Sequence, residues 1–178
     1  MKNKAVFIDR DGVINKLILK NGEETSPKSV RQFEIYPYVS EAINKIKSNN
    51  LIIVITNQPD IARGKLSIQE LSKINSRLNE LIEIDDIFVC MHDDVDNCDC
   101  RKPKPGLIFQ AVSKWDVDLK NSIVIGDSWR DMLAGKAAGI KTCYINRSSS
   151  IDKVIDIEFE YDFEAKNLLE AVNNIYVA

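Results

Sequence analysis

The sequence predicts an α/β fold in which a parallel sheet carries helices on both faces. Short apolar runs alternate five times with segments whose apolar residues recur at helical spacing. The run 51–55 (LIIVI) is apolar throughout, as expected of a strand that is buried on both faces. The 178 residues contain no internal repeat or linker, so we expect a single domain over 1–178.

The expected elements follow in chain order from local signals. Ser67 and Glu70 match a capping box, Pro105 suits a first helical turn, and Gly139 suits a helix end. Strands are expected over 4–8, 51–55, 87–91, 122–125 and 141–145. Helices are expected over 39–46, after Ser67, over 105–115, over 129–138 and over 165–175. The segments 16–31 and 147–160 are the least regular.

Composition and charge exclude some classes of function. The formal net charge of −3 argues against broad electrostatic binding to nucleic acid. The N-terminal segment has no apolar run of signal-peptide length, and no stretch approaches the length of a membrane span. We therefore expect a cytoplasmic protein with no membrane partner, in which thiols stay reduced.

Polar residues follow four of the predicted strands. In parallel α/β sheets ligands bind at the carboxyl ends of the strands, so these side chains are candidates for one site. They are Asp9 and Asp11 after the first strand, Thr56 and Asn57 after the second, Arg101 and Lys102 after the third, and Asp127 and Asp131 after the fourth.

The residue types at these positions fit phosphoryl transfer. Carboxylates with no histidine beside them suit a hard divalent cation, most simply Mg²⁺. An aspartate can act as a covalent nucleophile, and a second one as general acid and base. Thr56 and Lys102 offer a hydroxyl group and a positive charge to phosphate oxygens. Each motif alone would commonly be a turn or a cap; four together, each directly after a strand, favour an active site.

The motifs FIDRDGVIN, TNQ…ARG, C-x-H…C-x-CRKPKPG and GDSWRDMLAGKAAG carry a family resemblance. The chain resembles haloacid dehalogenase superfamily phosphatases from about residue 6 to about residue 145. Within them it resembles the small capless branch, subclass IIIA, that holds the heptose bisphosphate and histidinol-phosphate phosphatases. The resemblance implies a Rossmann-like fold without a cap domain. It also implies Mg²⁺-dependent phosphomonoester hydrolysis through an aspartyl-phosphate.

The resemblance also implies a role for each site residue. Asp9 would be the nucleophile and Asp11 the acid and base, while Thr56, Asn57 and Lys102 would hold the transferring phosphoryl group. Asp127 would complete the Mg²⁺ site with Asp9 and the main-chain carbonyl of Asp11, supported by Asp131, and Arg101 would recognise the substrate.

Three of the four cysteines and the only histidine lie within eleven residues, as Cys90, His92, Cys98 and Cys100. Their types, number and paired spacing predict a tetrahedral Zn²⁺ site, with a disulfide or unrelated thiols as alternatives. Four protein ligands leave no open position, so the zinc would be structural. It would rigidify a loop over about 90–105 and hold Lys102 near the active site. Cys143 is expected to be a core thiol.

The expected substrate is a small phosphorylated sugar, with D-glycero-D-manno-heptose 1,7-bisphosphate, cleaved at the 7-phosphate, preferred. Arg101, Arg63 or the lysines of 16–31 would bind the second phosphate. The short spacing from His92 to Cys98 is closer to the alternative, the histidinol-phosphate enzymes. Pro59 and Asp60 stand where the better-known heptose enzymes have Ser-Gly.

Functions of other classes fit the sequence less well. A receiver-type signalling module carries its phosphorylated aspartate after the third strand, where this chain has Cys90 and His92. A zinc-knuckle nucleic-acid binder needs basic residues and aromatics around the cluster, which here carries four aspartates instead. A DNA 3′-phosphatase is a closer rival that the net acidity disfavours. We expect a monomer, although no pattern in the sequence bears on assembly.

Overall fold

The computed structural model describes residues 2–147 and 157–176. Six strands form one sheet in the order β5-β4-β1-β6-β7-β8, and every neighbouring pair is parallel. After β1 the chain places β4 and β5 on one side of β1 and then β6, β7 and β8 on the other, so the direction in which strands are added reverses beside β1. This is where ligands bind in such sheets. The strands are β1 (Ala5–Ile8), β4 (Leu51–Asn57), β5 (Asp86–Cys90), β6 (Ile123–Gly126), β7 (Lys141–Ile145) and β8 (Phe163–Ala165).

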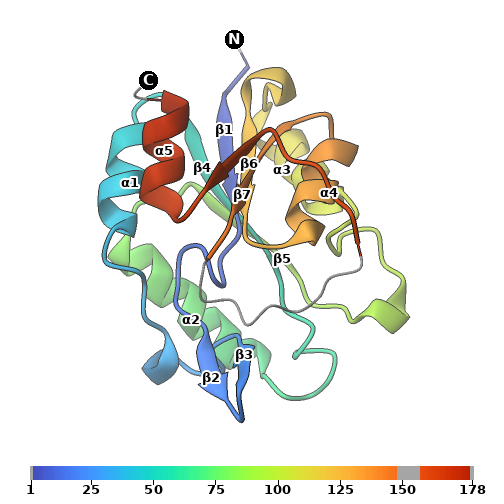
Figure 1. The fold of residues 1–178 in the computed structure, drawn as a ribbon. Helices are drawn as coiled ribbons and strands as arrows, with labels where there is room; N and C mark the ends of the chain where they lie inside the picture. Colours follow the sequence, from blue (N-terminus) through green and yellow to red (C-terminus); the bar gives the residue numbers. More distant parts are fainter. Residues whose placement is uncertain (1, 148–156, 177–178) are drawn as a thin grey trace.

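Helices cover both faces of the sheet, as predicted (Figure 1). Side chains alternate between the faces along a strand, and β1 shows this directly. Val6 and Ile8 pack in the core under α1 (Val39–Ile46), α2 (Ile68–Leu81) and α5 (Leu168–Tyr176). Ala5 and Phe7 pack in a second core under α3 (Gly106–Trp115) and α4 (Trp129–Ala137).

A β-hairpin lies at the end of the molecule toward which the strands point, and both termini lie at the opposite end (Figure 1). It consists of β2 (Ile18–Lys20) paired with β3 (Glu23–Thr25). The described residues contain no cap domain, so this hairpin and the loops form the rim of the strand ends. Three short 3₁₀ turns complete the fold: η1 (Val30–Gln32), η2 (Asp94–Asp96) and η3 (Leu119–Asn121).

Most predicted elements are confirmed with shifts of one or two residues at their ends. The helix expected from residue 165 is wrong at its start, because Ala165 pairs with Ile145 in β8 and α5 begins at Leu168. A three-residue strand is too short to show a periodicity. The segment 16–31, expected to be irregular, contains the hairpin. Much of the other irregular segment, 147–160, falls in 148–156, outside the described residues.

Two helix starts differ in detail from the prediction. Pro105 precedes the first helical residue of α3 instead of occupying its first turn. Ser67 accepts a hydrogen bond from the Glu70 backbone amide, as a capping residue does. The Glu70 carboxylate instead accepts from the backbone amide of Val30, so the reciprocal half of the capping box is missing.

At the end of α4, Gly139 has φ 71°, which suits a glycine helix stop.

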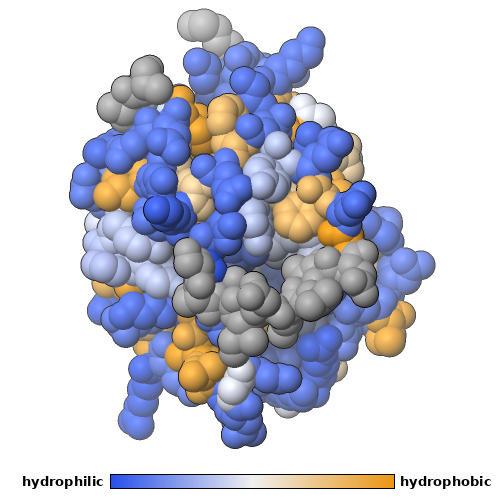
Figure 2. All heavy atoms as spheres, viewed as in Figure 1, coloured by the Kyte–Doolittle hydropathy of each residue, from blue (hydrophilic) through white to orange (hydrophobic). Residues whose placement is uncertain are grey.

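The face drawn in Figure 2 is mostly hydrophilic, with apolar side chains in small separate groups. The large exposed apolar residues belong to different elements, such as Leu19 in β2, Ile68 in α2 and Phe109 in α3. Among the described helices, none combines the length and apolar content that crossing a bilayer would require.

Candidate active site

Lys102 lies at the centre of the polar groups at the strand ends. Its side chain is only 4% exposed, and its Nζ donates to Asp9 Oδ1 at 2.7 Å, to Asp131 Oδ1 and to the Ile55 carbonyl at 3.0 Å. Burial alone would lower the pKa of Lys102, but the charges of Asp131 and Asp9 outweigh it and raise the pKa. The lysine therefore stays charged against the two carboxylates.

Asp9, Asp127 and Asp131 form a carboxylate cluster, with one oxygen from each within 4.8 Å of the others. Burial raises the pKa of Asp9 well above its ordinary value; the charge of Lys102 opposes this rise, and repulsion from Asp131 and Asp127 adds to it. Burial also raises the pKa of Asp127 to about 7, against the charge of Arg147. A cluster of buried oxygen donors with excess negative charge fits a hard divalent cation such as Mg²⁺.

Asp11 lies in a different environment from Asp9. Its oxygens accept from Arg10, with Nη2–Oδ2 at 3.0 Å, and from Gln58 Nε2 at 2.7 Å. Burial would raise the pKa of Asp11, but the charge and hydrogen bonds of Arg10 and the bond from Gln58 lower it. Gln58 also donates to Thr56 Oγ1 at 2.9 Å, so it joins the ends of β1 and β4. Asp11 is thus held as an ionised acceptor.

A cavity of about 370 Å³ opens over these groups. Asp9, Asp11, Thr56 and Lys102, the predicted catalytic residues, all line it, together with Asn57, which was predicted to bind substrate. Its other lining residues are Leu17, Glu24, Thr25, Ser26, Pro59, Arg101, Asp127, Ser128, Arg130 and Asp131.

Two expected sources of positive charge are not at this cavity. Arg63 is not among its lining residues; its Nε donates to Asp93 Oδ2 at 2.6 Å. In the 16–31 segment, Lys16 pairs with Glu34, and Lys28 pairs with Asp60 at 2.9 Å. That segment contributes Leu17 and the residues 24–26 to the cavity instead. Asp60 therefore faces Lys28, while its neighbour Pro59 lines the cavity.

Several residues near the cavity were not predicted from the sequence. Ser128 caps α4, accepting from the Arg130 amide at 3.2 Å, and Asp131 accepts from the Ser128 amide at 3.2 Å. The spacing S-x-x-D carried this signal. Arg130 lies within the motif GDSWRDMLAGKAAG, but the family resemblance gave it no role, and Arg147 lies outside the quoted motifs. Gly12, with φ 92°, is required by close approach, since a Cβ there would lie 2.1 Å from Asp127 Oδ2.

The second candidate metal centre is the Cys/His cluster. Sγ–Sγ distances among its cysteines are 3.2, 3.5 and 3.6 Å, and His92 Nδ1 lies 3.3 Å from Cys100 Sγ and 3.7 Å from Cys90 Sγ. A tetrahedron with Zn–S bonds of about 2.3 Å has edges of about 3.8 Å, close to these values. All four cysteines lie in the described residues, and none forms a disulfide. The donor set therefore fits Zn²⁺.

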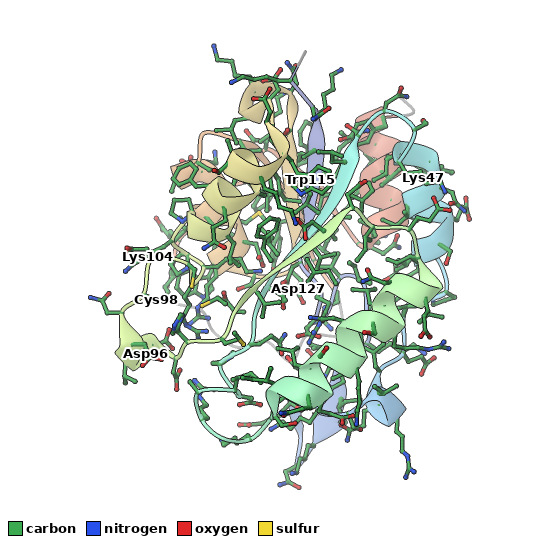
Figure 3. The ribbon with its side chains drawn as sticks, turned by 180° about the vertical axis from the view of Figure 1, so that it is seen from behind. Lys47, Asp96, Cys98, Lys104, Trp115 and Asp127 are labelled. Carbon is green, nitrogen blue, oxygen red and sulfur yellow. The ribbon has the colours of Figure 1, made fainter. Side chains whose placement is uncertain are left out.

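We call residues 91–104, which follow β5, the arm. Figure 3 shows Asp96, Cys98 and Lys104 together on it, beside the end of the sheet where Asp127 lies. Arg101 Nε donates to Asp94 Oδ1 at 2.6 Å, which joins Arg101 to the η2 turn of the arm. Arg101 and Lys102, at the end of the arm, both line the cavity.

Comparison with known proteins identifies the family. The model of haloacid dehalogenase-like hydrolases matches residues 27–139, more than half of the chain. The chain belongs to the haloacid dehalogenase-like hydrolases. The resemblance inferred from its motifs is therefore confirmed, and the receiver-type and zinc-knuckle alternatives lose their support.

Two bacterial relatives of this hydrolase are closely similar in length. One, from Campylobacter jejuni, is D-glycero-alpha-D-manno-heptose-1,7-bisphosphate 7-phosphatase, 37% identical over 97% of this chain and 96% of its own. Another, from Pasteurella multocida, is the corresponding beta-anomer 7-phosphatase, 35% identical over 78% of each chain. A crystal structure of D,D-heptose 1,7-bisphosphate phosphatase from B. bronchiseptica, complexed with magnesium and phosphate, superposes with a TM-score of 0.84. It shares 26% identity and covers 96% of this chain and 97% of that one.

Proposed function

We propose that this hydrolase removes the 7-phosphate from D-glycero-D-manno-heptose 1,7-bisphosphate. The observation that carries the proposal is the similarity, over almost the whole chain, to a relative named for that reaction. The polar cavity with Asp9 and Lys102 at its base supports phosphomonoester hydrolysis. The proposal includes a catalytic Mg²⁺, a structural Zn²⁺ and one cytoplasmic domain over 1–178 that acts as a monomer.

In this proposal Asp9 attacks the phosphorus atom and Asp11 gives a proton to the sugar oxygen that leaves. Asp11 then takes a proton from water, and that water attacks the aspartyl-phosphate and releases inorganic phosphate. Thr56 and Lys102 contact the phosphoryl oxygens. A bound Mg²⁺ would neutralise negative charge on the phosphoryl group and on Asp9 and Asp127. Asp11 accepts a hydrogen bond from Arg10 here, so its side chain must turn from Arg10 and take up a proton from water before it protonates the leaving sugar oxygen.

The alternative, histidinol phosphate, is kept because of the short spacing from His92 to Cys98. Phosphate release should therefore be measured with both anomers of heptose 1,7-bisphosphate, histidinol phosphate, nucleotides and a DNA 3′-phosphate. We expect a kcat/KM for one heptose anomer at least about tenfold above that for histidinol phosphate, or about 1.4 kcal/mol. ³¹P NMR should show loss of the 7-phosphate signal. The reverse ranking would reassign the enzyme.

A further inference from the structure

Arg130 is a cationic residue of the cavity for which the reaction above has no use. It lies in the first turn of α4, and its guanidinium carbon is 4.4 Å from the centroid of the Trp129 ring. Such stacking fixes the plane of the guanidinium group. Its Nε is buried and has no hydrogen-bond partner among the described residues. A buried donor without a partner is costly, so an acceptor that reaches this nitrogen would bind favourably.

The charge around Arg130 favours an anion. Arg101, on the arm, lines the same cavity and binds Asp94, whose side chain is 63% exposed. Arg101 donates to Asp94 through Nε at 2.6 Å and through Nη2 at 3.3 Å. Arg101 and Arg130 thus bring two guanidinium groups to the cavity, and one of them is paired with a largely solvated carboxylate. The cavity wall that they form keeps positive charge, and a phosphate accepts several hydrogen bonds from arginines.

The position of Arg130 separates it from the reacting phosphate. Its neighbour Asp131 is directed to Lys102, beside the nucleophile Asp9. Successive side chains on an α-helix diverge by about 100°, so Arg130 leaves α4 in a different direction from Asp131. Both residues nevertheless line one cavity. The reacting phosphate and a second anionic group could therefore occupy it together.

We propose that Arg130, together with Arg101, binds the second phosphate of a sugar bisphosphate. Arg130 is then a specificity-determining residue, which acts on the choice between bisphosphates and monophosphates rather than on the bond that breaks. This inference rests on the proposed function for the identity of the sugar. In this assignment Arg130 takes the place of Arg63 and the lysines of the 16–31 segment, which were expected to bind the second phosphate.

The test compares Arg130→Gln and Arg130→Lys with a matched control, Arg77→Gln. Arg77 lies on α2, pairs with Glu80 of the same helix at 2.9 Å and does not line the cavity. The measured quantity is the ratio of kcat/KM for heptose 1,7-bisphosphate to kcat/KM for heptose 7-phosphate. We expect this ratio to fall at least about tenfold in Arg130→Gln, chiefly through KM for the bisphosphate.

Arg130→Lys should restore part of the ratio, because it keeps the charge but loses the planar fork. Arg77→Gln should leave the ratio at its wild-type value. An equal loss for both substrates, or no loss, overturns the proposal, since a purely structural role would not change the ratio. If Arg130→Gln does not fold, as judged by circular dichroism, the same ratio of kcat/KM values is measured for Arg130→Lys. We then expect the ratio to fall at least about threefold, and an unchanged ratio overturns the proposal.

A failure of the proposed function gives a different result. In that case the wild type does not prefer heptose 1,7-bisphosphate to histidinol phosphate, whatever residue stands at 130. The ratio is then measured with fructose 1,6-bisphosphate and fructose 6-phosphate. The same tenfold fall in Arg130→Gln supports the second-phosphate site, and an unchanged ratio overturns it.

Discussion

The side chain of Asn57 and the backbone of Lys102 exchange two hydrogen bonds. Asn57 Nδ2 donates to the Lys102 carbonyl at 3.0 Å, and the Lys102 amide donates to Asn57 Oδ1 at 3.1 Å. This pair joins the end of β4 to the arm, across 45 positions in sequence. Asn57 was expected to hold the phosphoryl group. Its side-chain amide instead binds the backbone of Lys102, the residue whose side chain is expected to contact that group. The Lys102 backbone is thus held directly by β4 and lies two residues after the cluster cysteine at position 100.

Asn57→Ala should lower both activity and stability. It removes both hydrogen bonds and leaves the Lys102 amide and carbonyl without their partners, which costs about 1–3 kcal/mol. We expect kcat to fall about tenfold or more, because a lysine displaced by a fraction of an ångström supports the reaction less well. Urea unfolding and phosphate release measure the two effects. Loss of activity at wild-type stability would contradict this and favour direct phosphate contact.

Asp9→Asn should abolish phosphate release while the protein stays folded. The amide is a poor nucleophile and carries no charge for Lys102 or a cation. The substitution removes a carboxylate whose pKa is raised by burial, which means that its ionised form is costly in the folded protein. We therefore expect only a small change in Tm. Aluminium fluoride should bind at Asp9 in the wild type and not in the variant. The exposed Glu80→Gln serves as control; turnover by Asp9→Asn at the wild-type rate would exclude Asp9 as nucleophile.

Cys98→Ser should loosen the arm without unfolding the sheet. We expect about one zinc per chain in the wild type and much less in the variant, with activity falling more than stability. Mild EDTA should remove activity that Mg²⁺ alone restores, since oxygen ligands hold their cation weakly. Elemental analysis and circular dichroism measure these outcomes. Wild-type protein purified without zinc would contradict the assignment.

Thiol titration provides an independent check on the same cluster. After zinc is removed, Cys98 and Cys100, which are partly exposed, should react with a thiol reagent in the folded protein. Cys90 and Cys143 should not, because burial raises the pKa of each to about 12. These two thiols should appear only after denaturation. Four reactive thiols in the folded protein would show that β7 is accessible to the reagent.

Arg147→Gln should remove the ion pair that joins the β2–β3 hairpin to the end of β7. Arg147 donates to both oxygens of Glu24, at 3.2 and 3.1 Å, and to Asp127 Oδ2 at 3.1 Å. Without it, Glu24 loses its link to the sheet, and Asp127 loses a competing cation. We expect faster amide exchange over 18–25, a higher KM and tighter Mg²⁺ binding. Arg77→Gln is the matched control, and unchanged exchange in the hairpin would refute the link.

Local patterns were sufficient for the main elements and for the ligand types. The apolar run at 51–55, the helical spacing around Leu71 and the Cys/His pairs are short-range features, and each predicted its element or cluster. The carboxylates after β1 and β6 could be grouped because the ends of parallel strands meet at one edge. These inferences required no knowledge of how distant segments pack.

The partners of the side chains depended on distant packing. Arg63 and Arg130 are the same residue type, and only the tertiary structure places one at Asp93 and the other, in the first turn of α4, at the cavity. Asn57 meets the Lys102 backbone, and β8 pairs at the sheet edge, because segments far apart in sequence come together there. Periodicity and capping are set by neighbours within a few residues, whereas side-chain direction at a site is set by long-range contacts.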